Sequence, residues 1–317
     1  MGELNCQSIG ERFKELAALK RQFDVTLKAG QLDEAKKLEQ ALIRSIDEAS
    51  EMLDLKMLIR ERIARQRGYS FVSQFSEKGH ATAVTFGRDL SSFCVVIDSQ
   101  GKPVSQEYKR VWDAHDGVRR ASRLSGEAYC YLDEAGKENI EGGFSEAGDF
   151  SEGLAFVKKK GESRGYFIDT AGNPAIIGSD GRPKMFSRGN SFSEGLAAVS
   201  DENLGNYYID HTGQGVSGLF HLMSTGDFSE GLAVIRAVEK FQFIDQRGNP
   251  VMPRFFKSAG KFSSGLAPVE TERGWMFIDK TGKTMIGEDQ PFEDADQFSN
   301  GLARVRRGGK TYFIQPD

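Results

Sequence analysis

One six-residue motif recurs through this chain and limits its fold more than any other feature. "FSEGLA" occupies residues 150–155, 192–197 and 228–233, and "FSSGLA" and "FSNGLA" follow at 262–267 and 298–303. Counting two degenerate copies, the motif glycines are Gly79, Gly117, Gly153, Gly195, Gly231, Gly265 and Gly301. Their spacing of 34 to 42 residues is typical of repeat proteins, in which each unit buries its apolar face against the next.

Each repeat carries the pattern of a few short strands. After the motif glycine, apolar residues fall on every second position, as in "GLAFV" and "GLAAV", and this period predicts a strand. A second strand ends in an aspartate that is followed three positions later by a glycine. The pairs are Asp98 and Gly101, Asp133 and Gly136, Asp169 and Gly172, Asp210 and Gly213, Asp245 and Gly248, and Asp279 and Gly282. Aspartate can accept backbone hydrogen bonds in a turn and glycine tolerates positive φ, so D-x-x-G predicts a hairpin.

Repeats of this length suit either a closed β-propeller or an open β-solenoid. The last motif is followed by too few residues for a complete unit, and residues 69–75 match the segment that precedes the other motifs. Pairing these residues with the last repeat would close a ring and remove exposed sheet edges. We therefore expect a mainly β repeat domain over residues 67–317, in the form of a closed seven-bladed propeller, with the open solenoid as the alternative.

A helical arm is predicted before the repeats. Ser8 and Glu11 have the spacing of a capping box, and apolar residues then recur at helical spacing in two stripes. We expect an antiparallel helical hairpin or short coiled coil over residues 1–66. Leu38 and Leu42 lie on its second stripe, so they are candidate partner-binding residues and a route to self-association.

The repeat region resembles the WG-repeat proteins, a family found largely in bacteria. The resemblance rests on the FSEGLA copies, on the I-D-x-x-G elements, and on "RGYFID" at 164–169 and "RGWMFID" at 273–279, which keep parts of the tryptophan-glycine element. It implies a β-repeat scaffold, a bacterial source and no common catalytic chemistry.

Composition and charge narrow the partners. The formal charge of −4 and the pI near 5.8 argue against a nucleic-acid-binding surface. The N-terminal residues contain no apolar leader and no 18-residue apolar run follows, so we expect no membrane segment. Cys6, Cys94 and Cys130 are odd in number and far apart, which favours a reducing compartment. Together these features predict a cytoplasmic protein.

No pattern in the sequence predicts catalysis, a metal or a cofactor. The aspartate that ends the second strand becomes Gln315 in the one repeat where no turn follows, as a turn-forming role requires. The four histidines share no position in the repeat, and no nucleophile elbow or phosphate loop is present. We therefore expect a protein that is not an enzyme.

Protein recognition is the predicted function. Function in repeat proteins lies in the segments that differ between units, and the longest insertion is "SDGRPKMFSRGN" at 179–190. Its candidate contact residues are Arg182, Lys184, Met185, Phe186 and Arg188. Two alternatives stay open: a protein that neutralises a toxin or acts as an effector, and an enzyme or small-ligand binder at the mouth of the channel.

Overall fold

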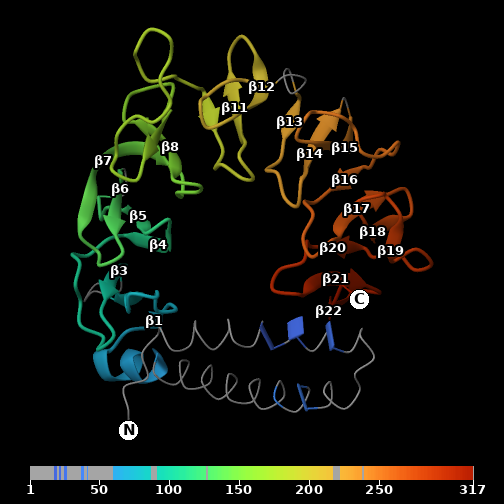
Figure 1. Cartoon of the computed structure of the whole chain (residues 1–317). Coiled ribbons are helices and arrows are strands. Elements are labelled where there is room, and N and C mark those ends of the chain that lie inside the picture. The colour runs from blue at the N-terminus through green and yellow to red at the C-terminus, as the bar shows by residue number, and fades with distance from the viewer. Residues whose placement is uncertain are drawn as a thin grey trace. The chain divides into compact units, whose positions relative to one another are not determined.

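A computed structural model describes most of the repeat region in two compact units, Met1–Gly142 and Gly143–Asp317. Its described residues are 60–86, 91–125, 128–216, 222–237 and 239–316, with positions 18, 19, 21, 22, 25, 26, 37, 38 and 41. These last positions are helical, and the remainder of the predicted hairpin over residues 1–59 lies outside the described residues. The mainly β prediction is confirmed, because strands β1 to β22 make up most of the regular structure described (Figure 1).

The Met1–Gly142 unit contains a helix that ends at residue 67 and two antiparallel sheets. The first sheet has the order β1-β2-β3, with β1 at Phe71–Val72, β2 at Ala81–Phe86 and β3 at Ser92–Ile97. The second contains β4 at Arg110–His115, β5 at Val118–Ser122 and β6 at Tyr129–Asp133. Strand β7, Glu138–Ala147, begins in this unit and ends in the next.

The Gly143–Asp317 unit continues the series of short antiparallel sheets. Its strands are β8 at Leu154–Lys159, β9 at Tyr166–Asp169, β10 at Arg188–Gly189, β11 at Ala197–Asp201, β12 at Gly205–Ile209, β13 at Ser224–Thr225, β14 at Leu232–Ala237 and β15 at Lys240–Asp245. They are followed by β16 at Ser258–Ala259, β17 at Ala267–Thr271, β18 at Gly274–Ile278, β19 at Thr284–Ile286, β20 at Asp294–Ala295, β21 at Ala303–Arg307 and β22 at Lys310–Ile314. The sheet orders are β10-β11-β12, β13-β14-β15, β16-β17-β18-β19 and β20-β21-β22.

The chain passes from one sheet to the next at the aromatic residue that precedes each motif. Phe256 exchanges two backbone hydrogen bonds with Phe241 of β15, at 2.8 and 2.9 Å. The next residue, Lys257, donates from its backbone N–H to Glu270 in the following sheet. Phe256 therefore pairs with the outer edge of one sheet, and the residue after it already pairs with the next sheet. This direct succession fixes the position of each repeat relative to the next.

The D-x-x-G turns form as predicted. In each of the six, the glycine N–H donates to the carbonyl oxygen of the aspartate at 2.9 to 3.0 Å. All six glycines have positive φ, between 76° and 88°. In five of the turns the Oδ1 atom also accepts backbone N–H groups two and four residues ahead; Asp245, for example, accepts from Arg247 and Asn249. The aspartates thus organise the hairpins.

The FSEGLA motif forms a second kind of turn and also links neighbouring repeats. Glu194 and Gly195 both have positive φ, 55° and 85°, as a type I′ hairpin turn requires. The Glu194 carboxylate accepts the N–H of Gly231 in the next motif at 2.8 Å, and the Ser193 hydroxyl donates to the carbonyl of Phe228 at 2.7 Å. The motifs that begin at residues 150 and 228 repeat both bonds. Glu152, Glu194 and Glu230 thus form the turns of their own motifs and also clasp the next repeat.

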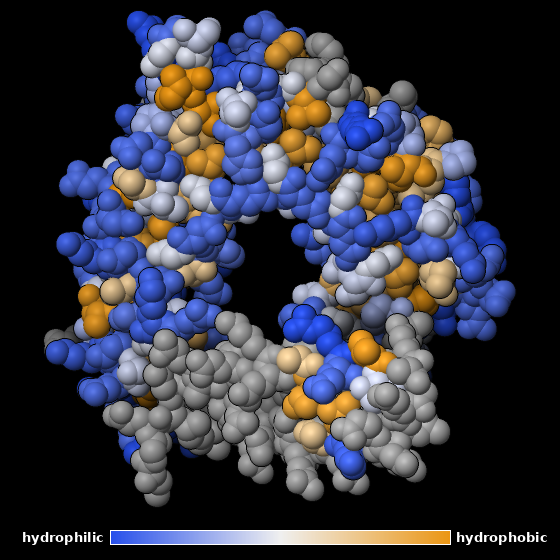
Figure 2. Space-filling model, in the orientation of Figure 1, coloured by the Kyte–Doolittle hydropathy of each residue, from blue (hydrophilic) through white to orange (hydrophobic). Residues whose placement is uncertain are grey.

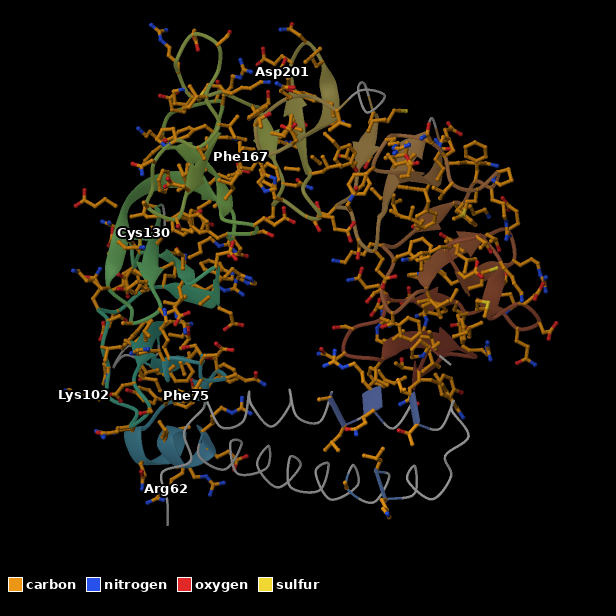
Figure 3. The ribbon with its side chains drawn as sticks, viewed as in Figure 1. Arg62, Phe75, Lys102, Cys130, Phe167 and Asp201 are labelled. Carbon is orange, nitrogen blue, oxygen red and sulfur yellow. The ribbon has the colours of Figure 1, made fainter. Side chains whose placement is uncertain are left out.

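The core lies between consecutive repeats. One cluster joins Phe156 and Phe167 of one repeat to Phe192 and Tyr207 of the next, and each is at most 2% exposed. Phe167 of β9 points into this layer (Figure 3) and makes edge-to-face contacts with Phe186 and Phe192. Because each repeat contributes only half of a core, a single repeat cannot bury its apolar face alone.

The helix that ends at residue 67 covers the first repeat. Ile63 is 7% exposed and packs with Val72 and Ile97. A Cβ on Gly101, in the first D-x-x-G turn, would lie 2.5 Å from Ile63 Cγ2, so only glycine fits there. In a later repeat, the cognate Gly213 meets Ile176 of the preceding repeat in the same way. The helix therefore contacts the turn at Gly101 as the preceding repeat contacts the turn at Gly213.

The role expected for residues 69–75 needs correction. Phe71 and Val72 form β1 and pair with Val84 and Ala83 of β2, so they complete the first repeat itself. Tyr69 donates its backbone N–H to Ala64 at 2.9 Å, and Gly68 has a φ of 74°, which together form a Schellman cap of the helix. The closed propeller stays a prediction, but this segment is already paired within its own unit.

Among the described residues, no helix is long and apolar enough to cross a membrane. Hydrophilic side chains occupy much of the face seen in Figure 2, with hydrophobic side chains scattered between them.

Candidate functional site

The second repeat departs most from the motif, and the departure is concentrated in one hairpin. Its residues 114–119 read "AHDGVR" where other repeats have "FSEGLA". Ala114 therefore stands at the phenylalanine position and Arg119 at the final alanine position. The two are direct partners across strands β4 and β5. In the other repeats the large residue of this pair comes first in the motif and the small residue last, whereas here the small Ala114 comes first and the large Arg119 last. Arg119 can therefore fill the volume that the phenylalanine fills in the other repeats.

Arg119 is a buried cation, only 2% exposed. Its guanidinium donates to Thr82 Oγ1 and the His80 carbonyl, both at 3.3 Å, and to the Glu134 carbonyl at 3.4 Å. Burial lowers the pKa of Arg119, while the charges of Asp113 and Glu134 act in the opposite direction. These contacts join two neighbouring repeats. A structural role therefore accounts for the burial of Arg119 without any role in binding or catalysis.

The opposite face of the same hairpin carries a cluster of aromatic and cationic residues. Arg110 and Trp112 lie on β4, Arg120 on β5 and Tyr129 on β6. The guanidinium carbons of Arg120 and Arg110 lie 4.1 and 4.9 Å from the centre of the Trp112 ring. The rings of Trp112 and Tyr129 are 6.0 Å apart. Arg110 is exposed and the other three are partly exposed, and we call these four residues the Trp112 surface.

The chemistry of the Trp112 surface suits recognition. An exposed guanidinium stacked on an aromatic ring, as that of Arg110 is, can present N–H groups around its edge, where they match the geometry of a carboxylate. Tryptophan, tyrosine and arginine are also the residue types that contribute most to protein interfaces. The surface is therefore equipped to bind an acidic segment of a protein through stacking and charge-assisted hydrogen bonds.

Nearby cysteines are not suited to chemistry. Cys94 and Cys130 are free and buried. Burial raises the pKa of the Cys130 thiol to about 11, and burial also raises that of Cys94. A thiol that stays protonated at neutral pH is a poor nucleophile and metal ligand. Cys130, on β6 (Figure 3), therefore acts as a core residue of the second repeat.

The candidate residues in the insertion at 179–190 have different environments. Phe186 is fully buried in the core, and Lys184 donates from Nζ to the carbonyl of Gly213 at 2.6 Å. Both residues therefore hold their repeat against its neighbour. Met185 is partly exposed, and Arg182 and Arg188 are exposed. Contact with a partner at this loop stays a prediction for these three residues.

The two candidates on the helical arm are described only in part. Leu38 is helical and partly exposed, and Leu42 lies outside the described residues. Their part in docking stays a prediction.

Within the described parts of the chain, no three histidine, cysteine, aspartate or glutamate side chains gather in a way that could hold a metal ion. The turn aspartates lie one to a repeat and are engaged by the backbone of their own turns.

Comparison with protein families identifies the repeat. Residues 129–162, 243–273 and 292–310 match the family described as "WG containing repeat". The first match begins at the start of β6 and the second inside β15, and both run through a D-x-x-G turn and a motif. The second match spans two neighbouring sheets. The resemblance inferred from the motif is supported over these stretches. No curated protein matches the chain.

Solved structures resemble this chain only distantly. BamB from Moraxella catarrhalis is 10% identical, with 77% of this chain and 81% of that chain covered and a TM-score of 0.43. Hsv2 from Kluyveromyces lactis is 11% identical, with coverage of 72% and 86% and a TM-score of 0.43. Virginiamycin B lyase from Staphylococcus aureus is 10% identical, with coverage of 76% and 92% and a TM-score of 0.37.

The Trp112 surface was absent from the residues predicted from sequence. From the sequence, the second repeat is predicted only as a degenerate copy of the motif. One signal could have found it: Trp112 is one of two tryptophans in the chain and has arginines two residues before it and eight after. The exchange of Ala114 and Arg119 was a second signal, because it compensates volume as a maintained structure requires.

Proposed function

We propose that this protein is a non-enzymatic, cytoplasmic scaffold that binds an acidic segment of a partner protein through the Trp112 surface. The observation that carries the proposal is the stacking of Arg110 and Arg120 on Trp112, at 4.9 and 4.1 Å, in the repeat that departs most from its copies. Repeats that keep the motif build the scaffold, and the one that differs supplies recognition.

The charge of the surface favours an acidic ligand. Lys109, Arg110 and Arg120 lie on or beside β4 and β5, within a chain whose overall charge is −4. A basic patch on an acidic protein favours acidic segments of other proteins and disfavours nucleic acid, because phosphate backbones are repelled by the rest of the surface.

Affinity capture with matched variants tests this function. Tagged protein carrying Trp112→Ala should lose its partner by at least about tenfold, since aromatic anchors dominate interface free energy. Trp112→Phe should retain part of the binding. Arg182→Ala, in the insertion at 179–190, is the control and should bind as the unmodified protein does. Capture that Trp112→Ala leaves unchanged while Arg182→Ala abolishes it would move recognition to the insertion.

For the arrangement of the repeats we retain the closed seven-bladed propeller as our proposal. It is supported by seven motif copies and by sheets of at least three short antiparallel strands, as propeller blades require. Removing residues 298–317 should then cause aggregation, because a ring loses its closure with its last blade. An open solenoid would lose stability by a small step and stay soluble.

A further inference from the structure

Among the described residues, no segment covers the outer edge of the last sheet as one covers the edges of several earlier sheets. In the first, third, fourth, fifth and sixth repeats, the chain that follows the D-x-x-G turn returns along the outer edge of the sheet. It ends at a residue that bridges this edge: Tyr108 to Cys94, Phe186 to Gly165, Leu222 to Asn206, Phe256 to Phe241 and Phe292 to Trp275. The last sheet has the order β20-β21-β22, and β22 pairs only with β21 among the described residues.

The uncovered edge exposes groups that are paired elsewhere. Thr311 lies opposite Arg306 as Phe241 lies opposite Arg236, so its N–H and carbonyl face outward as those of Phe241 do. The outward carbonyl of Phe243 accepts the N–H of Val251 at 3.1 Å, and its counterpart in β22 is the carbonyl of Phe313. Within the described residues, these three groups of Thr311 and Phe313 have no backbone partner beyond β21. A sheet edge of this kind is a template for another strand.

A side chain of β22 is also exposed where its counterparts in other repeats are buried. Phe313 is the counterpart of Phe167, Phe243 and Phe277, which are 0% exposed, yet Phe313 is 69% exposed. Each counterpart contacts the aromatic residue of its covering segment, with ring centres 5.9 to 6.2 Å apart. No such ring contacts Phe313 in the described part of the chain.

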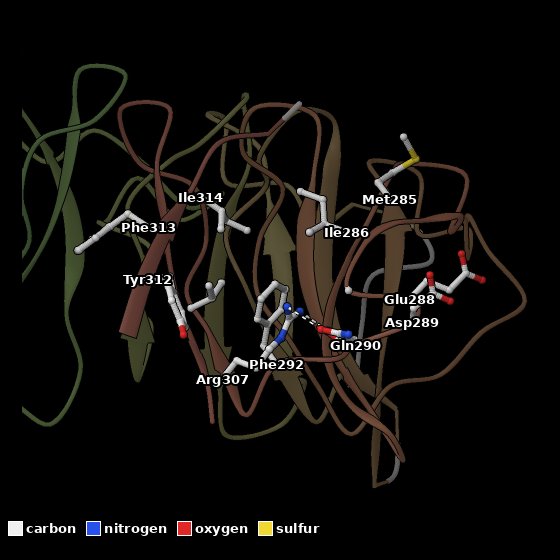
Figure 4. A pocket seen from close by; sticks show the side chains of 12 residues that line it. Met285, Ile286, Glu288, Asp289, Gln290, Phe292, Arg307, Tyr312, Phe313 and Ile314 are labelled. Carbon is white, nitrogen blue, oxygen red and sulfur yellow. Dashed lines mark hydrogen bonds between the residues drawn. The ribbon is translucent and has the colours of Figure 1, made fainter. Parts of the chain in front are cut away.

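A groove beside β22 shows what the missing cover should contain. It has a volume of about 910 Å³ and is lined by residues of β19, β22 and the loop at 287–290. Figure 4 shows Tyr312 and Phe313 on one side, with the carboxylates of Glu288 and Asp289 on the other. Arg307 stacks on Phe292 between them, 4.1 Å from the ring centre. The groove thus combines an apolar wall with an acidic rim.

The chain's own first covering position is already engaged. Tyr69 is the counterpart of Phe256 for the first motif, but its N–H donates to Ala64 in the helix cap. It cannot also make the bond that Phe256 makes through the same group. Tyr69 therefore does not cover β22 in the way that Phe256 covers β15.

We propose that β22 accepts an extended segment of a partner protein as an added antiparallel strand, with an aromatic residue opposite Thr311 and a basic residue facing Glu288 and Asp289. The covering segments within the chain supply the pattern: Arg254 lies over Phe256 at 5.6 Å and Lys184 over Phe186 at 5.8 Å. Backbone hydrogen bonds give such an added strand its affinity, and the side-chain pockets give its specificity. The inference rests on the proposed function as a protein-binding scaffold but assigns a different surface.

A peptide taken from the chain itself tests the inference. Residues 250–257, "PVMPRFFK", form the cover of β15 and carry the aromatic and basic residues that the groove requires. Fluorescence anisotropy should show that the labelled peptide binds the full chain. A peptide with Phe256→Ala should bind at least about tenfold more weakly, because the aromatic anchor is lost.

Variants of β22 locate the binding. Thr311→Pro removes the outward N–H and should weaken binding by at least about tenfold, whereas Thr311→Val keeps it and should bind normally. Proline is tolerated on an edge strand, and a circular dichroism melt confirms that each variant folds. Glu288→Lys should lower the affinity for the peptide. It should also make that affinity less sensitive to salt concentration. Absence of peptide binding, or equal binding by Thr311→Pro and Thr311→Val, would overturn the inference. Trp112→Ala should leave peptide binding unchanged, so failure here is distinct from failure of the Trp112 surface.

Discussion

The first and last repeats are built from the same motif but are covered in different ways. In the first, a helix packs Ile63 against Gly101 and leaves Val72 and Ile97 buried. In the last, nothing described covers β22, and Phe313 and Tyr312 are 69% and 46% exposed. The difference indicates that the helix completes the packing of the first repeat, whereas the described residues leave β22 uncovered.

The largest expected difference between a covered and an uncovered strand lies at Phe277 and Phe313. Phe277→Ala removes a fully buried ring and should lower the free energy of unfolding by about 3–5 kcal/mol. Phe313→Ala removes a mostly exposed ring at the cognate position and should change it by less than about 0.5 kcal/mol. Urea denaturation followed by circular dichroism measures both. A large loss with Phe313→Ala would mean that β22 is covered.

The helix cap can be tested at two glycines of one repeat. Gly101→Ala combines positive φ with a 2.5 Å clash against Ile63, and we expect a loss of about 2–4 kcal/mol. Gly79 has a similar φ of 79°, but its nearest neighbour would lie at an ordinary 3.8 Å. Gly79→Ala should therefore lose only about 1–2 kcal/mol. Similar losses at the two sites would remove the argument that the helix packs on the first repeat.

The clasps between repeats should have a smaller effect. Glu194→Ala removes the acceptor of the Gly231 N–H, and Glu194→Gln keeps an acceptor of the same length. We expect losses of about 1 kcal/mol for alanine and less for glutamine, because the site is near the surface. In the last two motifs Ser264 and Asn300 replace the glutamate, so Ser264→Ala is a matched control without a clasp of this kind. If all three variants melt together, the carboxylate contributes nothing.

The smallest expected effect is the pH dependence of the turns. The hydroxyls of Thr212 and Thr281 lower the pKa of Asp210 and Asp279, and the N–H of Asn249 lowers that of Asp245. Because each folded pKa lies below its unfolded value, the stabilisation is present above about pH 4 and is lost as the pH falls through the folded pKa. Asp245→Asn should make stability less dependent on pH between about pH 4 and pH 2. An unchanged acid profile would contradict this account of the turns.

Local patterns allowed the regular parts of the fold to be predicted. Alternating apolar residues located the strands, and D-x-x-G located the turns, because both depend on residues close in sequence. The Glu152 clasp was missed because its partner Gly195 is 43 positions away. Phe313 could not be told from Phe277 either, because burial depends on which segment covers a strand. The Trp112 surface was missed for a related reason, because a degenerate copy of the motif does not by itself indicate a site. Only the pairing of Ala114 with Arg119 across two strands shows that the exchange preserves volume.

Hydrogen exchange at single amides tests most directly whether the last repeat is open. The N–H groups of Phe241 and Trp275 donate to their covering segments at 2.8 Å, and Thr311 is their counterpart on β22. In the full chain we expect the Thr311 amide to exchange at least about a hundredfold faster than those of Phe241 and Trp275, and to slow when the peptide of residues 250–257 is added. Protection of Thr311 equal to that of Phe241 and Trp275 before any peptide is added would show that β22 is already covered and would contradict the account.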